Sequence, residues 1–210
     1  MTTEELNPLL AGRPAPPQLV VISGPSGVGK DTVLLRMRDM GFPFHFVVTA
    51  TSRAMRPTER DGYDYHFVSE TRFREMIVQD ELLEWAEVYG HFKGIPKSEI
   101  RQAHASGRDV MLRVDVQGAA TIRQLAPEAV FIFIAPGSID ELRNRLRWRR
   151  TESVDEMETR LAVARHELEQ VGAFDYVVIN REDQLDEAAG QIRSIIAAEK
   201  QRVRPRRVQL

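Results

Sequence analysis

Short apolar runs alternate with amphipathic segments along most of this chain. Runs of β-branched and aromatic residues at positions 20–22, 46–48, 110–114, 130–134 and 176–179 predict strands that are buried on both faces. Helical spacing of apolar residues begins near positions 32, 117, 139, 154 and 185. Because the predicted strands and helices alternate, the pattern indicates an α/β fold whose parallel sheet is covered by helices on both faces.

Two intervals break this alternation. Residues 51–96 are richer in aromatic and charged side chains, with strand-like pieces at 64–68 and 83–89 around a helix near 71–79. We interpret them as an inserted lobe of mixed α and β structure that closes over a second ligand. Residues 143–160 are dense in arginine and predict a small helical lid. The remaining core of this single domain then comprises residues 18–50, 97–142 and 161–199.

Both ends of the chain are predicted to be tails. Residues 1–17 are polar, rich in proline and without the basic start and apolar centre of a secretory signal, so we expect a flexible tail. Residues 200–210 are basic, and we expect this second tail to be solvated.

Composition narrows the class of protein. The 210 residues carry a net charge of −2, which gives no reason to expect nucleic-acid binding. The chain has no cysteine, so disulfides and thiolate metal sites are excluded and a reducing cytoplasm is favoured. No apolar run approaches the ~20 residues needed to span a bilayer. We therefore expect a cytoplasmic monomer or homo-oligomer without a nucleic-acid or membrane partner.

A glycine-rich turn directly follows the first predicted strand. Its glycines let the backbone curl around a polyphosphate so that successive N–H groups point at the oxygens, and the next helix adds its positive N-terminal end. Lys30 supplies a mobile charge for the β- and γ-phosphates. The pattern Gly-x-x-x-x-Gly-Lys is complete, and it predicts a phosphate-binding loop made of Gly24, Pro25, Ser26, Gly27, Val28, Gly29, Lys30, Asp31 and Thr32.

A second candidate phosphate site lies in the inserted lobe. Arg53 and Arg56 are three residues apart and can fork onto one phosphate, and the hydroxyl of Tyr65 can add a neutral donor. A solvated basic loop is the alternative interpretation of this segment taken alone. The presence of one phosphate site beside another favours the functional interpretation.

The order of these motifs resembles that of the guanylate kinase family. The resemblance covers residues 18–198. It implies a P-loop NTPase-type parallel sheet with an inserted GMP-binding lobe and a lid. It also implies an enzyme that moves a phosphoryl group from Mg²⁺-bound ATP to GMP, with dGMP as a further candidate acceptor. The motifs that carry it are residues 24–30, the segment from Thr49 to Phe67, Glu84-Trp85-Ala86-Glu87-Val88, Val114-Asp115-Val116-Gln117-Gly118, Arg149 and Arg160-Leu161.

The resemblance also implies roles for individual residues of the GMP site. Guanine offers N1–H and an amino group as adjacent donors, which one carboxylate such as that of Glu84 accepts together, whereas adenine has an acceptor at N1. Asp115 ends an apolar strand, where ligands of open α/β sheets gather, and it is also a candidate helix N-cap. The full expected set is Arg53, Arg56 and Tyr65 for the phosphate, Thr49, Glu84 and Asp115 for the base, and Glu59 and Lys93 beside them.

The expected catalytic residues are all cations. Phosphoryl transfer needs its charge neutralised and its oxygens held in line, and the attacking phosphate oxygen is already anionic near neutral pH, so no general base is required. Neighbouring arginines such as Arg145 are expected to be solvated charges of the lid or a helix face, with contact of one of them to ATP as the alternative. The histidines show no metal-ligand spacing. The resemblance assigns catalysis to Lys30, Arg53 and the lid arginines Arg149 and Arg160.

Besides Ser52, Met55 and Thr58 in the segment from Thr49 to Phe67, four departures from the family pattern bear on the site. Asp31 replaces the hydroxyl that normally ligates Mg²⁺; as a hard oxygen donor it is a candidate ligand, but it adds negative charge beside the phosphates. The family usually has an acid where this chain has Arg113, so we hypothesise an Asp31–Arg113 contact, which a separation beyond about 6 Å would refute. Lys93 takes the place of a phosphate-binding tyrosine, and Ile95 that of a small hydroxyl residue.

Two other functions stay open on the sequence alone. A related kinase of ribose 1,5-bisphosphate also uses a Gly-Lys-Asp loop in this fold, although that substrate offers Glu84 no base to recognise. Guanylate-kinase-like modules of scaffold proteins bind protein partners without catalysis, but their phosphate loops are degraded, whereas this chain retains Lys30, Arg149 and Arg160.

Overall fold

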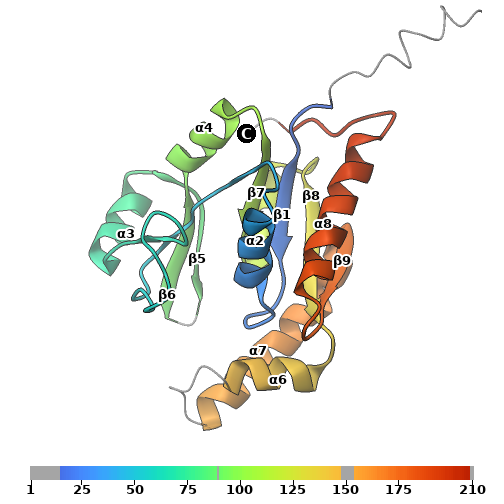
Figure 1. Ribbon diagram of the computed structural model, residues 1–210. Coiled ribbons are helices and arrows are strands. Elements are labelled where there is room, and N and C mark those ends of the chain that lie inside the picture. The colour runs from blue at the N-terminus through green and yellow to red at the C-terminus, as the bar shows by residue number, and fades with distance from the viewer. Residues whose placement is uncertain (1–14, 89, 148–153, 209–210) are drawn as a thin grey trace, which may run out of the picture.

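The centre of the protein is a parallel sheet. The computed structural model describes residues 15–88, 90–147 and 154–208. In this part of the chain five strands pair in the order β2-β7-β1-β8-β9, and every neighbouring pair runs parallel (Figure 1). The expected α/β class is confirmed. The strands are β2 (Phe44–Phe46), β7 (Asp109–Arg113), β1 (Leu19–Ser23), β8 (Val130–Pro136) and β9 (Tyr176–Asn180).

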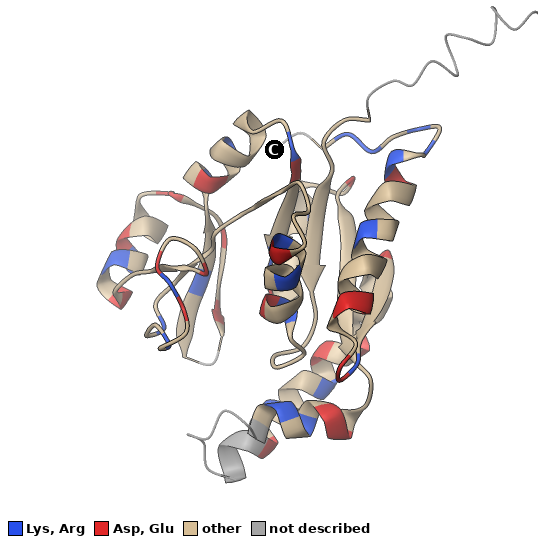
Figure 2. Ribbon diagram, in the orientation of Figure 1, with Lys and Arg blue, Asp and Glu red and all other residues tan. Residues whose placement is uncertain are grey.

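Helices cover both faces of this sheet. Val20 and Ile22 of β1 pack into one apolar cluster with helices α2 and α8, whereas Leu19 and Val21 pack into another with α4 and α5. Strands β1 and β8 are therefore buried throughout and carry no charged residue, and charged residues lie on the helices and loops around them (Figure 2). The four helices are α2 (Lys30–Asp39), α4 (Lys97–Ala105), α5 (Val116–Leu125) and α8 (Leu185–Lys200).

The inserted lobe contains a second, mixed sheet beside the core (Figure 1). Its order is β4-β3-β6-β5, with β3 and β4 parallel and the other pairs antiparallel. Phe73 and Met76 of the lobe helix pack on Leu82 and Phe92 of the sheet. The lobe elements are β3 (Ala50–Thr51), β4 (His66–Phe67), α3 (Glu70–Val78), β5 (Leu82–Val88) and β6 (His91–Pro96).

Two helices lie near the carboxyl ends of the core strands (Figure 1). Helix α6 (Ile139–Arg147) follows β8, and α7 (Val154–Glu169) returns along it and runs into the short helix η1 (Gln170–Ala173). Leu142 and Leu146 of α6 pack on Leu161 and Ala164 of α7. The predicted lid spans parts of both helices, and its residues 148–153, with Arg149 among them, lie outside the described residues.

Several elements differ from the sequence predictions. The strand expected at 46–48 runs from Phe44 to Phe46, although the N–H of Val47 still donates to the carbonyl of Met111 at 3.1 Å. Strand β6 and helix α4 were not predicted. Strand β6 contains Gly94 and a terminal Pro96, so it lacks a strand-like alternation, and it forms because it pairs with β5.

The basic C-terminal segment contradicts the expectation of a solvated tail. Nε of Arg206 lies 3.0 Å from a carboxylate oxygen of Glu199, which is only 1% exposed, and Nη1 donates to the carbonyl of Ala129 at 3.0 Å. A buried carboxylate requires a partner, and Arg206 supplies it. Residues 1–14 of the predicted N-terminal tail lie outside the described residues. In the described part of the chain, no helix has the length and apolar character to cross a membrane.

Candidate active site

The predicted phosphate-binding loop joins β1 to α2. Gly24, Gly27 and Gly29 all have positive φ angles of 139°, 84° and 94°, which side chains rarely tolerate. A Cβ on Gly24 would lie 2.1 Å from the carbonyl oxygen of Ile134, so no side chain fits there. The curled backbone that the motif predicts is therefore present, and it requires glycine at these positions.

Two side chains that sequence analysis did not assign hold this loop. The carbonyl of Val28 accepts hydrogen bonds from Nδ2 of Asn180 at 2.8 Å and from Nη1 of Arg145 at 2.9 Å. Arg145 also donates to the carbonyl of Asn180 and to Glu141, so the expectation of a solvated arginine is wrong. The only sequence signal for Asn180 is its place as a polar residue at the end of a predicted strand.

Lys30 lies folded against its own loop. Its Nζ donates to the carbonyls of Gly24 and Pro25, the latter at 3.1 Å. Burial lowers the pKa of Lys30 to about 8, although the nearby carboxylate of Glu167 acts in the opposite direction. An anionic phosphate at the loop would offset this loss of solvation and favour the charged ammonium.

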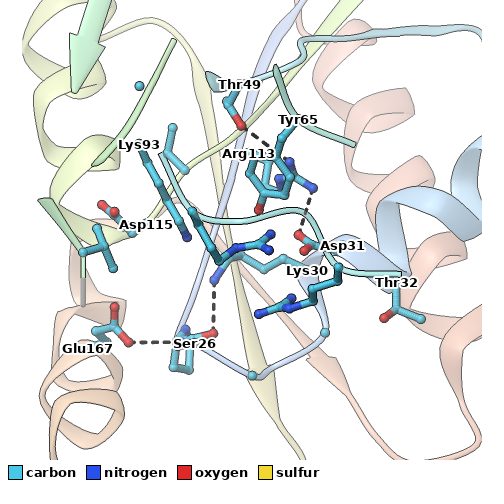
Figure 3. A pocket seen from close by; sticks show the side chains of 18 of the residues that line it. Ser26, Lys30, Asp31, Thr32, Thr49, Tyr65, Lys93, Arg113, Asp115 and Glu167 are labelled. Carbon is cyan, nitrogen blue, oxygen red and sulfur yellow. Dashed lines mark hydrogen bonds and ion pairs between the residues drawn. The ribbon is translucent and has the colours of Figure 1, made fainter. Parts of the chain in front are cut away.

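Glu167 is a site residue that no sequence motif indicates. It projects from α7 toward the loop, and its carboxylate accepts the N–H of Ser26 at 3.1 Å (Figure 3). Burial raises the pKa of Glu167, while the charge of Lys30 lowers it. Arg160, also on α7, approaches the hydroxyl of Ser26 at 3.4 Å. The lid-bearing helix thus contacts the phosphate loop through residues of both charges.

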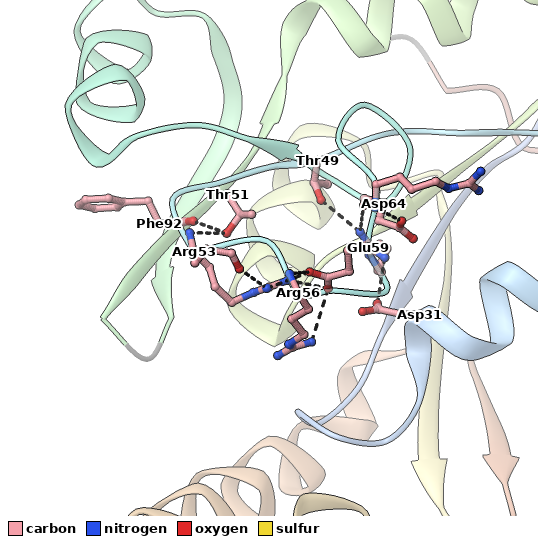
Figure 4. Close-up of polar contacts among 11 residues, drawn as sticks. Asp31, Thr49, Thr51, Arg53, Arg56, Glu59, Asp64 and Phe92 are labelled. Carbon is pink, nitrogen blue, oxygen red and sulfur yellow. Dashed lines mark hydrogen bonds and ion pairs between the residues drawn. The ribbon is translucent and has the colours of Figure 1, made fainter. Parts of the chain in front are cut away.

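The two arginines of the inserted lobe converge on one glutamate. Nη1 and Nη2 of Arg53 donate to the two carboxylate oxygens of Glu59 at 3.0 and 2.8 Å, and the N–H of Arg56 donates to the same carboxylate at 2.8 Å (Figure 4). Burial alone would raise the pKa of Glu59, but the hydrogen bonds and charges of the arginines lower it. Glu59 therefore binds the side chain of Arg53 and the backbone of Arg56.

The hypothesised contact between Asp31 and Arg113 is confirmed. Nη1 of Arg113 lies 2.9 Å from Oδ1 of Asp31 (Figure 3). The acid in the phosphate loop and the arginine at the end of β7 thus neutralise each other. In the described residues, no group of three or more acidic or histidine side chains is arranged to hold a metal ion. Mg²⁺ needs only one or two carboxylates when nucleotide phosphates and waters supply its other ligands. The carboxylate of Asp31 is therefore sufficient as a protein ligand.

Glu84 and Asp115 form the opposite end of the site. Glu84 is 8% exposed, and its Oε2 has no hydrogen-bond partner in the described part of the chain. Burial, and then the charge of Asp115, raise the pKa of Glu84 to about 7. Asp115 caps α5, because its Oδ1 accepts the N–H of Gly118 at 2.8 Å, as the N-cap interpretation predicts. A buried carboxylate without a donor is an acceptor site for a ligand.

The two departures on β6 have different outcomes. Lys93 faces the site, where burial lowers its pKa and the charges of Asp31 and Asp115 act to raise it. Ile95 is fully buried in the apolar cluster on the α4 and α5 face of the sheet. The isoleucine therefore stabilises the core.

One cavity brings the two predicted sites together (Figure 3). Glu59 and Arg160 stand behind or beside its lining, and Arg149 lies outside the described residues. A second groove, across the loop, includes Asn144, Asn180 and Arg181. The predicted residues that line the shared cavity are Pro25, Ser26, Gly27, Gly29, Lys30, Asp31, Thr32, Thr49, Arg53, Arg56, Tyr65, Glu84, Lys93 and Asp115.

Comparisons with known proteins agree with this arrangement. The guanylate kinase family model matches residues 16–199. Guanylate kinase 2, chloroplastic/mitochondrial, of Oryza sativa subsp. japonica is 52% identical over 94% of this chain and 70% of its own length. A guanylate kinase of Caldanaerobacter subterraneus subsp. tengcongensis is 46% identical over 88% of this chain and 89% of its own.

A solved structure supports the same assignment. The crystal structure of guanylate kinase from Anaplasma phagocytophilum superposes with a TM-score of 0.73 at 32% identity, covering 90% of this chain and 88% of that one. The family model, the relatives and the fold all agree, and the chain belongs to the guanylate kinase family.

Proposed function

We propose that this protein transfers the γ-phosphoryl group of ATP to GMP, which yields ADP and GDP. The observation that carries the proposal is the buried, unpaired carboxylate of Glu84 in the cavity that also contains the phosphate loop. A carboxylate in that state accepts adjacent donors, and guanine presents two of them on one edge. The activity would serve purine nucleotide recycling, in the cytoplasm as the cysteine-free composition predicts.

The acceptor nucleotide would lie with its base against Glu84 and its phosphate toward the phosphate loop. Asp115 and Thr49 line the base end of the cavity, where they add polar contacts. Arg53, Arg56, Tyr65 and Lys93 would supply the donors and positive charge for the phosphate. Adenine carries an acceptor at N1 and would leave Glu84 unpaired, which supports discrimination against AMP.

The donor phosphates would bind the backbone N–H groups of the glycine loop. Lys30 would exchange its contacts with the carbonyls of Gly24 and Pro25 for the β- and γ-phosphate oxygens. Arg160, and Arg149 by family resemblance, would neutralise the charge of the group in transfer. The groove that includes Asn144, Asn180 and Arg181 gives the donor base a place beside the loop. The acceptor phosphate is its own nucleophile, so alignment and charge neutralisation suffice.

Asp31 is the candidate protein ligand for Mg²⁺ in this site. It follows the loop lysine directly, and a carboxylate oxygen together with nucleotide phosphates is a normal donor set for this ion. Mg²⁺ bound with ATP supplies charge neutralisation at the β- and γ-oxygens.

Turnover of ATP with different acceptors tests the proposal. We expect turnover with GMP, and at least about 10³-fold lower kcat/KM with AMP because Glu84 would be left unpaired. Parallel assays use dGMP, to test whether a 2′-hydroxyl is required, and ribose 1,5-bisphosphate. Turnover of the bisphosphate without GMP turnover would favour the related sugar kinase. Absence of turnover with every acceptor would favour a non-catalytic module.

A lysine variant separates catalysis from folding. Lys30→Ala should lose most of the activity while keeping the thermal melting of the wild-type protein, because the ammonium of Lys30 donates to carbonyls of its own loop and, in the described part of the chain, ties no other element to the core. Retention of activity by this variant would contradict the assigned role of the loop.

A further inference from the structure

The turn that brings Tyr65 into the acceptor site is fastened to the core by two arginines. Nη1 of Arg38, on α2, donates to the carbonyl of Tyr63 at 3.2 Å, and its guanidinium lies 4.4 Å from the centre of the Tyr63 ring. Nη2 of Arg113, at the end of β7, donates to the carbonyl of Asp64 at 2.8 Å. The inserted lobe is thus tied to the core immediately beside Tyr65.

Arg113 contacts the acceptor site on one side and the phosphate loop on the other. Its guanidinium lies 4.2 Å from the centre of the Tyr65 ring and 3.5 Å from the hydroxyl of Thr49. Its other terminal nitrogen is paired with Asp31, in the first turn of α2. The planar fork of an arginine allows these contacts at once, which the single ammonium of a lysine does not.

The ion pair with Asp31 stabilises the buried guanidinium of Arg113. The side chain of Arg113 is 12% exposed, and a guanidinium removed from water needs a counter-charge. Asp31 provides an ion pair to it at 2.9 Å, and burial would otherwise disfavour the charged form. Loss of the carboxylate leaves a buried cation that must move toward water, and that movement withdraws it from Asp64 and Tyr65.

We propose that Arg113 is a positioning residue for the acceptor nucleotide and that Asp31, a residue of the donor loop, holds it in place. The inference rests on the proposed GMP site. Its consequence is that a substitution in the donor loop weakens acceptor binding even when no donor is present. Because Arg38 supplies a separate anchor for the same turn, the effect is a partial loss of affinity.

Calorimetric titration with GMP, in the presence of a chelator and without ATP, tests this directly. Asp31→Asn and Arg113→Met should each weaken GMP binding about fivefold or more, the range of typical coupling between sites. Asp39→Asn removes an exposed carboxylate from the same helix and should bind GMP as the wild type does. Arg113→Lys should fall between wild type and Arg113→Met, because it keeps the charge but loses the fork.

A double variant tests whether the two residues act together. If Asp31 acts through Arg113, then Asp31→Asn combined with Arg113→Met should cost no more GMP affinity than Arg113→Met alone. Additive losses would overturn the proposal. Wild-type GMP affinity in Asp31→Asn would also overturn it, and would confine Asp31 to the donor site.

Two further measurements separate a local effect from unfolding and from failure of the GMP site. The first is thermal melting of each variant. The side chain of Asp31 is 42% exposed, so Asp31→Asn should fold and can be tested even if Arg113→Met does not fold. Failure of the wild-type protein to bind GMP would overturn the proposed function itself. Wild-type binding with unaffected variants would overturn only the positioning role.

Discussion

Two glutamates of the inserted lobe have opposite electrostatic environments. Glu59 accepts three hydrogen bonds from Arg53 and Arg56, and the arginines lower its pKa. Glu84 is more deeply buried, but one of its oxygens has no partner in the described residues and its pKa is raised to about 7. The proposed phosphate end of the acceptor site is therefore neutralised by its own side chains, whereas the proposed base end has an acceptor that is left for a ligand.

This difference assigns separate tasks to the two ends. The contact with Glu59 holds the long, entropically costly side chain of Arg53 in place before a phosphate arrives, which favours binding through preorganisation. The unpaired Glu84 destabilises the empty protein, and a ligand with two adjacent donors relieves that cost. Specificity for the base should therefore depend on Glu84, and affinity for the phosphate on the arginines.

The largest expected effect comes from Glu84→Gln. The amide replaces one acceptor by an NH₂ donor that faces the donors of guanine, so kcat/KM for GMP should fall about 10²-fold or more. Thermal stability should not fall, because a buried charge is removed. Steady-state kinetics with GMP and a melting curve measure both effects.

Glu87→Gln is the matched control, because Glu87 lies on the same strand and is exposed. Its kinetics should equal those of the wild type. Unchanged kinetics in Glu84→Gln would show that Glu84 does not recognise the base. The structural reason to propose guanine would then be lost.

The second largest effect is expected at the phosphate end. Arg53→Met removes a bidentate donor, and contacts to charged groups of about 1.5–3 kcal/mol correspond to a loss of about 10- to 100-fold in GMP affinity. Affinity for guanosine, which lacks the phosphate, should not change. Glu84→Gln should weaken both ligands. A loss of guanosine binding in Arg53→Met would show that the two ends do not act separately.

The sequence allowed prediction of the residues whose roles follow from local pattern. The strand before Gly24, the positive-φ glycines and the pair of arginines all belong to short contiguous motifs. The Asp31–Arg113 contact spans 82 positions and was still predictable. Compared with the family pattern, an acidic residue is gained at position 31 and one is replaced by arginine at position 113, and both changes are visible in the sequence.

The roles of Asn180, Arg145 and Glu167 were not predictable in this way. Each side chain reaches the phosphate loop from more than a hundred positions away, as the contacts to Val28 and Ser26 show. Arg145 belongs to the arginine-dense stretch that predicts the lid, but nothing in that stretch distinguishes it from its neighbours. Only the docking of α6, α7 and β9 brings the three side chains to the loop. The opposite states of Glu59 and Glu84 likewise depend on tertiary burial, since both are simply glutamates near aromatic residues in the sequence.

The raised pKa of Glu84 predicts an effect of pH on the base end alone. The carboxylate must be ionised to accept both donors, so guanosine affinity should rise as pH rises through about 7, and fall about tenfold from about pH 8 to about pH 6. Guanosine is the proper ligand because it has no titrating phosphate. The variant Glu84→Gln should show a flat profile over this interval.

The same shift has a consequence for stability with a definite sign. The folded pKa of about 7 exceeds the usual 4.5, so between these values the unfolded chain releases its proton first. The contribution of Glu84 to the free energy of unfolding therefore decreases as pH rises through this window. Glu84→Gln should remove that part of the slope in urea denaturation curves. An unchanged slope would contradict the burial-driven shift.

The smallest effect is expected for Glu59→Gln. The amide oxygen still accepts from Arg53 or from the N–H of Arg56, so part of the arrangement is retained, while a negative charge beside the proposed phosphate site disappears. We expect GMP affinity to rise about two- to threefold, as is typical for a partly screened pair of charges. Calorimetry with GMP, and with guanosine as the control that should not respond, measures this change. A fall in affinity beyond about tenfold would mean that Glu59 binds GMP itself, as the family resemblance first predicted. Both glutamates would then bind the ligand directly, and the contrast between the two ends would be wrong.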